Sequence, residues 1–185
     1  DMTVTNSTVA NNNYYDGDCY SPSVDNAGTM VLRSSTIAGN GNCSADYVTH
    51  PGLLNRDGAT LSMSQNVVTG SFVSTPSDPT GETFTGRVLT NEGTILTSEY
   101  NLFADNSLTS ADAFNGFTPG LTDVVATIDG TTPTALEDII LLEPATWSVG
   151  YTQARLADNG GPTQTVALVS GSPALDAGGT DCLPT

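Results

Sequence analysis

A repeated eight-residue pattern constrains the fold of this chain more than any other feature. Residues 5–12 (TNSTVANN) match residues 33–40 (RSSTIAGN) at an offset of 28, and weaker copies follow at 64–70 and 92–98. Each copy is too short to bury its apolar side alone, so successive copies are expected to stack into one core. We predict that one column of stacked core residues consists of Val9, Ile37, Val67 and Ile95.

The period of the copies favours a parallel β-helix, an all-β solenoid with rungs of roughly 20–30 residues and loop excursions. An antiparallel β-sandwich also places short strands at regular intervals, but it does not require like residues to recur at a fixed period. Segments rich in Pro, Gly, Asp and Asn separate the copies, and we expect loops at 13–27, 42–58 and 74–83.

We expect one domain over 1–185, because a chain of 185 residues is long enough to bury a single core. Its parts are clear repeats, irregular rungs and a finishing segment, at 1–106, 107–155 and 156–185. Residues 134–142 fit a helical turn, since Thr134 and Glu137 have capping-box spacing, and they fit a buried strand equally well. The chain opens inside the repeat pattern, so we expect it to be part of a longer precursor.

The most specific motif is LADNGGPTQTVALVSGSPALDAGG, at 156–179. It predicts a strand over 163–169 between two turns, because Gly supplies a positive φ and Pro fixes φ. Asp176 is expected to be a structural carboxylate that accepts backbone N–H groups. The first turn is expected to consist of Asn159, Gly160, Gly161 and Pro162.

The same stretch closely resembles the C-terminal signature of bacterial surface proteins of the choice-of-anchor Q type. The resemblance implies a right-handed parallel β-helix without catalytic activity. It also implies that the protein is secreted or displayed at the cell surface.

The charge of the chain excludes several kinds of partner. Twenty acidic residues face four arginines and no lysine, which gives a formal net charge of −16. Nucleic acids and anionic membranes are therefore not expected to bind, because both need a basic surface. No run of apolar residues is long enough to span a membrane.

In the secreted context that the resemblance implies, cysteines are expected to form disulfides. We predict a disulfide between Cys19 and Cys43, which lie in the loops after the first two copies. Free thiols, or pairing outside the chain, are the alternatives. Cys182 is then left over, and it either pairs with another chain or stays free.

Acidic loop residues are the only candidate metal ligands. Carboxylates at Asp16, Asp18, Asp105 and Asp112 are of the type that binds calcium, although no EF-hand pattern surrounds them. The alternative is that they are solvated turn residues. We expect no other cofactor.

A catalytic site is not expected. His50 is the only histidine, and no Gly-x-Ser-x-Gly motif accompanies it. Polysaccharide lyases need Lys or Arg beside the substrate carboxylate, and hydrolases need paired carboxylates on adjacent rungs. An ice-binding threonine ladder is set aside as well, since Val31 and Arg33 would follow Thr3 and Thr5 in the next rung.

These observations lead us to expect a secreted structural or adhesive surface protein that is not an enzyme. Its partners would be further copies of itself, a cell surface or a glycan. End-to-end stacking into a filament is a further hypothesis, because an unpaired terminal strand edge is a template for another chain. The alternatives are a carbohydrate-active β-helix and a glycan- or calcium-binding module.

Overall fold

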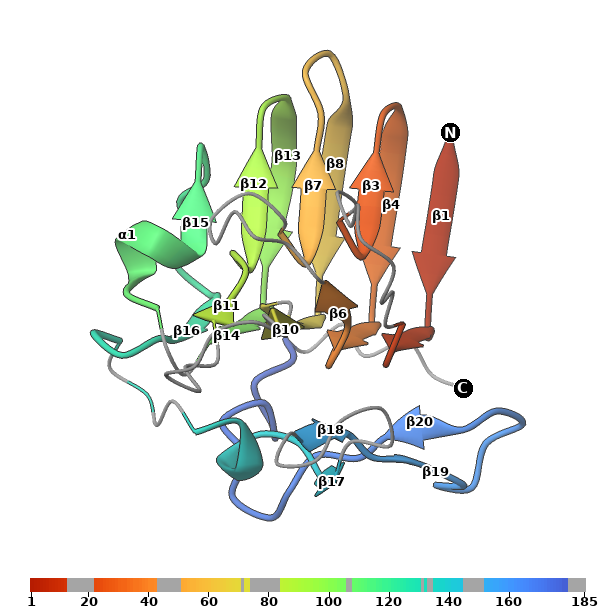
Figure 1. Ribbon diagram of the computed structural model, residues 1–185. Helices are drawn as coiled ribbons and strands as arrows, with labels where there is room; N and C mark the ends of the chain where they lie inside the picture. The colour runs from red at the N-terminus through yellow and green to blue at the C-terminus, as the bar shows by residue number, and fades with distance from the viewer. Residues whose placement is uncertain are drawn as a thin grey trace.

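The computed structural model describes residues 1–12, 22–42, 51–70, 72–73, 84–105, 108–130, 132, 135–144 and 152–179. It is nearly all β-strand, as predicted, and most strands lie in parallel sheets (Figure 1). Helix is limited in the described ranges to α1 (Ser110–Ala113) and the 3-10 turn η1 (Leu136–Asp138). Neither of them is long or apolar enough to cross a membrane.

Three parallel sheets form the body of the molecule. Sheet 1 contains β1 (Met2–Thr5), β4 (Thr29–Arg33), β8 (Thr60–Ser64) and β13 (Thr94–Glu99). Sheet 2 contains β3 (Val24–Asn26), β7 (Leu53–Asn55), β12 (Leu89–Asn91) and β15 (Phe114–Asn115). Sheet 3 contains β2 (Thr8–Ala10), β5 (Thr36–Ala38), β9 (Val67–Thr69), β14 (Leu102–Ala104) and β16 (Val124–Ala126). From β3 onward, the chain runs repeatedly through sheets 2, 1 and 3 in that order, and we call each such round a pass. The first pass contains β1 and β2, and the last described pass adds no strand to sheet 1.

The remaining strands are short. Sheet 4 contains β6 (Gly41–Asn42), β10 (Phe72–Val73) and β11 (Phe84–Thr85), of which the last pair is antiparallel. Two antiparallel pairs follow near the C-terminus: β17 (Leu142–Pro144) with β18 (Thr152–Ala154), and β19 (Leu156–Ala157) with β20 (Thr165–Val166). These four strands lie beneath sheet 3 in Figure 1. We call the described residues from 135 to 179 the C-terminal segment.

Sheet 1 buries one face only, and its sequence shows why. Apolar and polar residues alternate in β8, whereas in β4 only the burial alternates: Met30 and Leu32 point inward on either side of the half-buried Val31. Leu61 and Met63 repeat this arrangement in the next strand. The inward side chains meet residues of the other two sheets in one core, which includes Leu53, Leu89, Ile37, Val68 and Phe103.

Sheet 3 is buried on both faces. Its strands are almost continuously apolar, as is typical of parallel strands covered on both sides. Val68 and Phe103 face the main core, whereas Leu102 and Ala104 belong to a second core. The C-terminal segment supplies the other half of that second core, through Leu136, Ile139, Ile140, Ala154 and Val166.

The expected stacking column is right at its start and wrong further along. Val9 lies opposite Ile37, as the offset of 28 predicts. Ile37, however, pairs with Val68, and Val68 pairs with Phe103. A slip of one residue turns Val67 toward the second core, because side chains alternate between the faces of a strand. Ile95 lies in sheet 1 opposite Leu61.

Side-chain ladders join the passes at the corners between sheets. Between sheets 2 and 1, Asn26 Nδ2 donates to Asn55 Oδ1, and Asn55 Nδ2 donates to Asn91 Oδ1, both at 2.7 Å. Between sheets 1 and 3, Asn66 Nδ2 donates to Asn101 Oδ1 at 2.8 Å. Asn26, Asn55, Asn66 and Asn101 are at most 4% exposed, and the ladders supply the hydrogen bonds that buried amides need.

The finishing segment contains less strand than the sequence suggested. Only Thr165–Val166 of the expected strand over 163–169 is a strand, although Leu168 forms an isolated bridge with Ile140. The stretch 134–142, for which a helical turn and a strand were both expected, contains the 3-10 turn η1 and the start of β17, so each alternative holds in part. Ala135 rather than Thr134 precedes this turn, and no side chain caps it.

Candidate functional site

The outward surface of sheet 1 is a hydroxyl-rich face. Its strands are in parallel register, which aligns Thr29, Thr60 and Thr94 in one row. A second row aligns Thr3 with Val31, Ser62 and Thr97. We call the outward strand positions of sheet 1 the hydroxyl face, although Val31 and the exposed Leu96 in it are apolar: Thr3, Thr5, Thr29, Val31, Arg33, Thr60, Ser62, Ser64, Thr94, Leu96, Thr97 and Glu99.

This face carries little of the protein's charge. Arg33 and Glu99 are its two ionisable side chains, whereas the whole chain carries a net charge of −16. Arg33 Nε donates to Ser64 Oγ at 3.1 Å, which ties the guanidinium to the neighbouring strand. The register also places Val31 and Arg33 beside Thr3 and Thr5, as the sequence predicted, so that no continuous threonine ladder forms.

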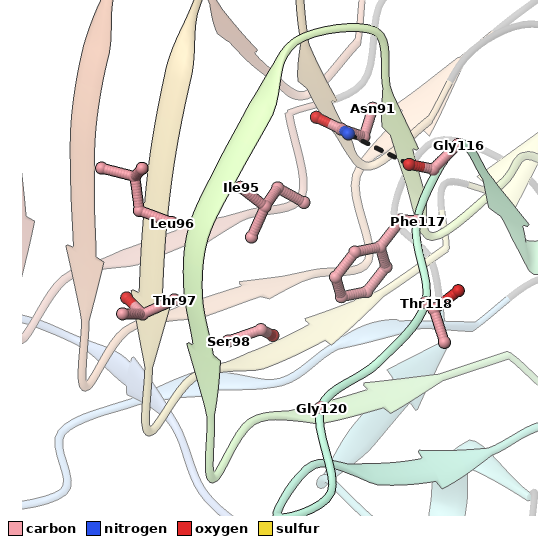
Figure 2. Close-up of a pocket in the computed structure, with 9 residues that line it drawn as sticks. All are labelled: Asn91, Ile95, Leu96, Thr97, Ser98, Gly116, Phe117, Thr118 and Gly120. Carbon is pink, nitrogen blue, oxygen red and sulfur yellow. Dashed lines mark hydrogen bonds between the residues drawn. The ribbon is translucent and has the colours of Figure 1, made fainter.

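The edge of sheet 1 borders a groove. Sheets 2 and 3 each continue by one strand beyond β12 and β14, but sheet 1 ends at β13 within the described residues. The chain at 116–120 passes beside β13 without joining it, and it leaves a cavity of about 340 Å³ (Figure 2). We call this cavity the β13 groove; it is lined by Asn91, Ile95, Leu96, Thr97, Ser98, Gly116, Phe117, Thr118 and Gly120.

The lining of the β13 groove is apolar and neutral-polar, with no ionisable side chain. Ile95 and Phe117 extend toward each other from its two sides in Figure 2. Asn91 Nδ2 donates to the Gly116 carbonyl at 3.0 Å and closes one end. Such a lining offers apolar contact and hydrogen bonds to a neutral ligand, but it holds no group suited to proton transfer at neutral pH.

Asp123 is the carboxylate next to the groove, and its oxygens are occupied by structural hydrogen bonds. Its Oδ1 accepts from the backbone N–H and Nδ2 of Asn101, at 2.9 and 3.0 Å. Its Oδ2 accepts from Ser98 Oγ at 2.6 Å and from the Gly120 N–H at 2.8 Å. Asp123 therefore ends the ladder that runs through Asn66 and Asn101, and it fastens the 116–120 segment to β13.

The structure gives two of the four expected calcium ligands individual structural roles. Asp105 is 1% exposed, and its Oδ1 accepts from the Leu108 N–H at 3.0 Å. Asp112 lies in α1, where its Oδ2 accepts from Thr109 Oγ1 at 2.6 Å. Among the described residues, no group of three or more acidic, His or Cys side chains is arranged to hold a metal. Asp16 and Asp18 lie outside the described residues.

Sequence reasoning did not single out Asp129. Its Oδ1 accepts from the Ser110 N–H at 2.7 Å, from Thr127 Oγ1 at 2.9 Å and from Ser110 Oγ at 3.0 Å. The pKa of the Asp129 carboxyl lies below its ordinary value of 3.8, first because the Ser110 N–H donates to the charged form and then because Thr127 does. The carboxylate fixes the start of α1 to the chain that follows β16.

The expected turn near the C-terminus is present between β19 and β20. Asn159 Nδ2 donates to the carbonyl and Oγ1 of Thr165, both at 3.0 Å, and Gly160 has φ of 93°. Gly161 and Pro162 complete the connection. Asp176 is exposed and has φ of 58°, so it is a turn residue on the surface and does not lie in the apolar setting that the sequence suggested.

Several expectations fall outside the described residues. Cys19, Cys43 and Cys182 do so, and the predicted disulfide therefore stays a prediction. His50 lies outside them too.

The corner asparagines were also missed. Asn26, Asn55 and Asn91 recur at unequal spacings, so a search at a fixed period does not align them.

Comparison of this chain with protein-family models, curated proteins and solved structures found no match.

Proposed function

We propose that the protein is a non-catalytic structural and adhesive element of the extracellular or cell-surface type, built as a right-handed parallel β-helix. The hydroxyl face is its contact surface. The observation that carries the proposal is this face itself: a four-stranded surface of hydroxyl side chains, with few charges, on a strongly acidic protein. The resemblance of residues 156–179 to choice-of-anchor Q surface proteins agrees with it.

The proposed partner is a neutral surface rich in hydroxyl groups, such as an insoluble polysaccharide. Threonine and serine hydroxyls donate and accept hydrogen bonds, so they match partners that do both. A flat parallel sheet repeats these groups about every 4.8 Å across the strands. Acidic polymers fit less well, because the net charge of −16 repels them at long range.

Co-sedimentation with insoluble neutral polysaccharides tests the proposal. A double variant, Thr60→Glu with Ser62→Glu, places two charges in the middle of the hydroxyl face and should reduce the bound fraction at least fivefold. Thr152→Glu, at an exposed position of β18, is the matched control and should leave binding unchanged. Equal binding of all three proteins, or depolymerisation of any glycan by the wild-type protein, would contradict the proposal.

A second candidate function is glycan binding in the β13 groove. The specific observation is that its uncharged lining combines the Phe117 ring with amide and hydroxyl groups, which is the chemistry of a neutral sugar site. Titration with neutral oligosaccharides, followed by NMR, should then shift signals of residues 95–98 and 116–120. Thr118→Trp should block those shifts by filling the groove, whereas Thr152→Trp should not. Shifts confined to the hydroxyl face would reject this candidate.

A further inference from the structure

A bulge interrupts β13 where this strand borders the β13 groove. The register with β8 shifts between Ile95 and Thr97, so that Leu96 is an extra residue in β13 and is 63% exposed. A bulge bends its strand and ends regular pairing. No backbone hydrogen bond joins the 116–120 segment to β13 in the described part of the chain. This edge of β13 therefore presents backbone N–H and carbonyl groups to the groove.

Two glycines close the groove at its two ends, because a residue without a Cβ atom allows another backbone to come close. A Cβ atom at Gly116 would collide with the carbonyl of Asn91, just before β13. A Cβ atom at Gly120 would collide with the carbonyl of Ser98, near the end of β13. Hydrogen bonds from the Asn91 amide and to the Asp123 carboxylate hold these two contacts. The groove is therefore a bounded pocket and not a channel along the strand.

The inner side of the groove is apolar, and its outer side adjoins the hydroxyl face. Ile95 and Phe117 are half-buried, pack against the main core and point toward each other (Figure 2). Leu96 and Thr97 also line the groove, but their side chains point away from Phe117 and are exposed on the hydroxyl face. The two surfaces thus share β13.

The geometry points to a terminal-sugar pocket: the β13 groove holds the terminal unit of a neutral polysaccharide chain that lies on the hydroxyl face. The apolar face of the sugar ring would lie against Ile95 and Phe117. Its hydroxyl groups would exchange hydrogen bonds with Thr118 and with the backbone edge of β13. This inference rests on the proposed function and joins its two candidate surfaces into one binding site.

The shape of the groove favours a terminal unit over an internal one. Ligand pockets generally enclose roughly 300–1,000 Å³, and the cavity of about 340 Å³ lies at the small end of this range. An internal segment that lay along β13 would have to leave the pocket at both ends, where Gly116 and Gly120 close it. A segment that crossed β13 would meet the 116–120 segment. An extended peptide is obstructed in the same way, and its pairing would need a regular strand edge, which the bulge removes.

The dependence of affinity on chain length tests the inference. The protein is the double variant Thr60→Glu with Ser62→Glu, in which the charged hydroxyl face does not compete for the ligand. The probes are soluble, linear, neutral glucans of α- and β-linkage, each as a short oligosaccharide and as a chain about ten times longer. At least one short oligosaccharide should shift the NMR signals of residues 95–98 and 116–120.

The Kd per chain should then agree within about twofold for the short and the long form, because both have the same number of ends. A site for internal units should instead bind the longer chain about tenfold more tightly, since that chain has about ten times as many such units. Thr118→Trp in the same background should weaken binding about tenfold, because the indole fills the pocket. Thr152→Trp, at an exposed position of β18, is the matched control and should bind normally.

Four results would overturn the inference: no shift with any glucan, shifts confined to other residues, a Kd per chain that falls in proportion to chain length, or equal affinity in the Thr118→Trp variant. If that variant does not fold, the chain-length measurement still decides. Failure of the wild-type protein to sediment with any insoluble polysaccharide would refute the proposed function itself. Sedimentation of the wild-type protein together with one of the four results would refute the terminal-sugar pocket alone.

Discussion

Sheet 1 and sheet 3 are built from the same passes of the chain, yet one face of sheet 1 is bare and sheet 3 is covered on both sides. The difference follows from alternate residues. Outward positions of sheet 1 are mostly threonine and serine, whereas those of sheet 3 include Ala38, Leu102 and Ala104, which are almost fully buried. Burial of apolar surface on sheet 3 therefore holds the C-terminal segment in place. The comparison teaches that parallel sheets built from the same stretches of chain can differ in burial, because the residue types at their outward positions differ.

The largest loss of stability is expected from a charge on the face of sheet 3 that the C-terminal segment covers. Ala38→Glu puts a carboxylate among the apolar side chains of the second core, and it should cost about 4 kcal/mol or more. Thr29→Glu, exposed on sheet 1, should change the free energy of unfolding by less than about 0.5 kcal/mol. Urea denaturation measures both variants. Losses within about 1 kcal/mol of each other would break the distinction between the two faces.

The next largest loss of stability is expected when an apolar side chain is removed from the second core. Leu102→Ala removes a side chain that is 2% exposed in the second core and should cost about 3 kcal/mol. Thr60→Ala is the matched change on sheet 1 and should cost a few tenths of a kcal/mol. Limited proteolysis should also cut the C-terminal segment faster in the Leu102 variant. Unchanged proteolysis together with a full loss of stability would show that Leu102 supports the main core instead.

A smaller loss of stability is expected from the hydrogen bonds between Asn11, which follows β2, and β18. Asn11 Nδ2 donates to the Ala154 carbonyl at 2.7 Å, and the Ala154 N–H donates to Asn11 Oδ1 at 3.1 Å. Asn11→Gly keeps the backbone, whose φ is 56°, and should cost about 1–2 kcal/mol for two hydrogen bonds. Asn11→Ala should cost about 1 kcal/mol more, because alanine is strained at positive φ. Thermal unfolding measures the stability of both variants. Equal losses of stability would show that the positive φ of residue 11 has no effect.

The smallest effect is a pH dependence where the chain leaves sheet 3. The pKa of Asp129 is lowered in the folded protein, so its hydrogen bonds stabilise the fold above pH 3.8. That contribution should fade as the pH drops below 3.8 through the folded-state pKa. In Asp129→Asn, the Ser110 amide signal should not titrate in this range by NMR. Titration of Ser110 in the variant would assign the effect to another carboxylate.

The alternating pattern of sheet 1 was readable in advance, but the partners of sheet 3 were not. In β8, a period of two places Leu61 and Met63 on the buried face without any knowledge of the fold, whereas the apolar run from Met30 to Leu32 in β4 shows no such alternation. A continuous apolar run such as that of β14 predicts burial, but it does not say which segment covers the second face. The β13 groove could not be predicted from the sequence either, because it exists only where the 116–120 segment passes beside β13 without pairing with it.

The sequence by itself determined the all-β class and the register of the first two passes, since Val9 and Ile37 are aligned by an uninterrupted offset of 28. Only the tertiary structure decided that Val68 and Phe103 continue this column. Later passes differ in length, and the length of an insertion leaves no mark on the strand pattern that follows it. The contact of Asn11 with Ala154, 143 residues away, was hidden for a related reason. It uses the backbone N–H and carbonyl of Ala154, which nearly every residue has and which therefore leave no signature in a sequence.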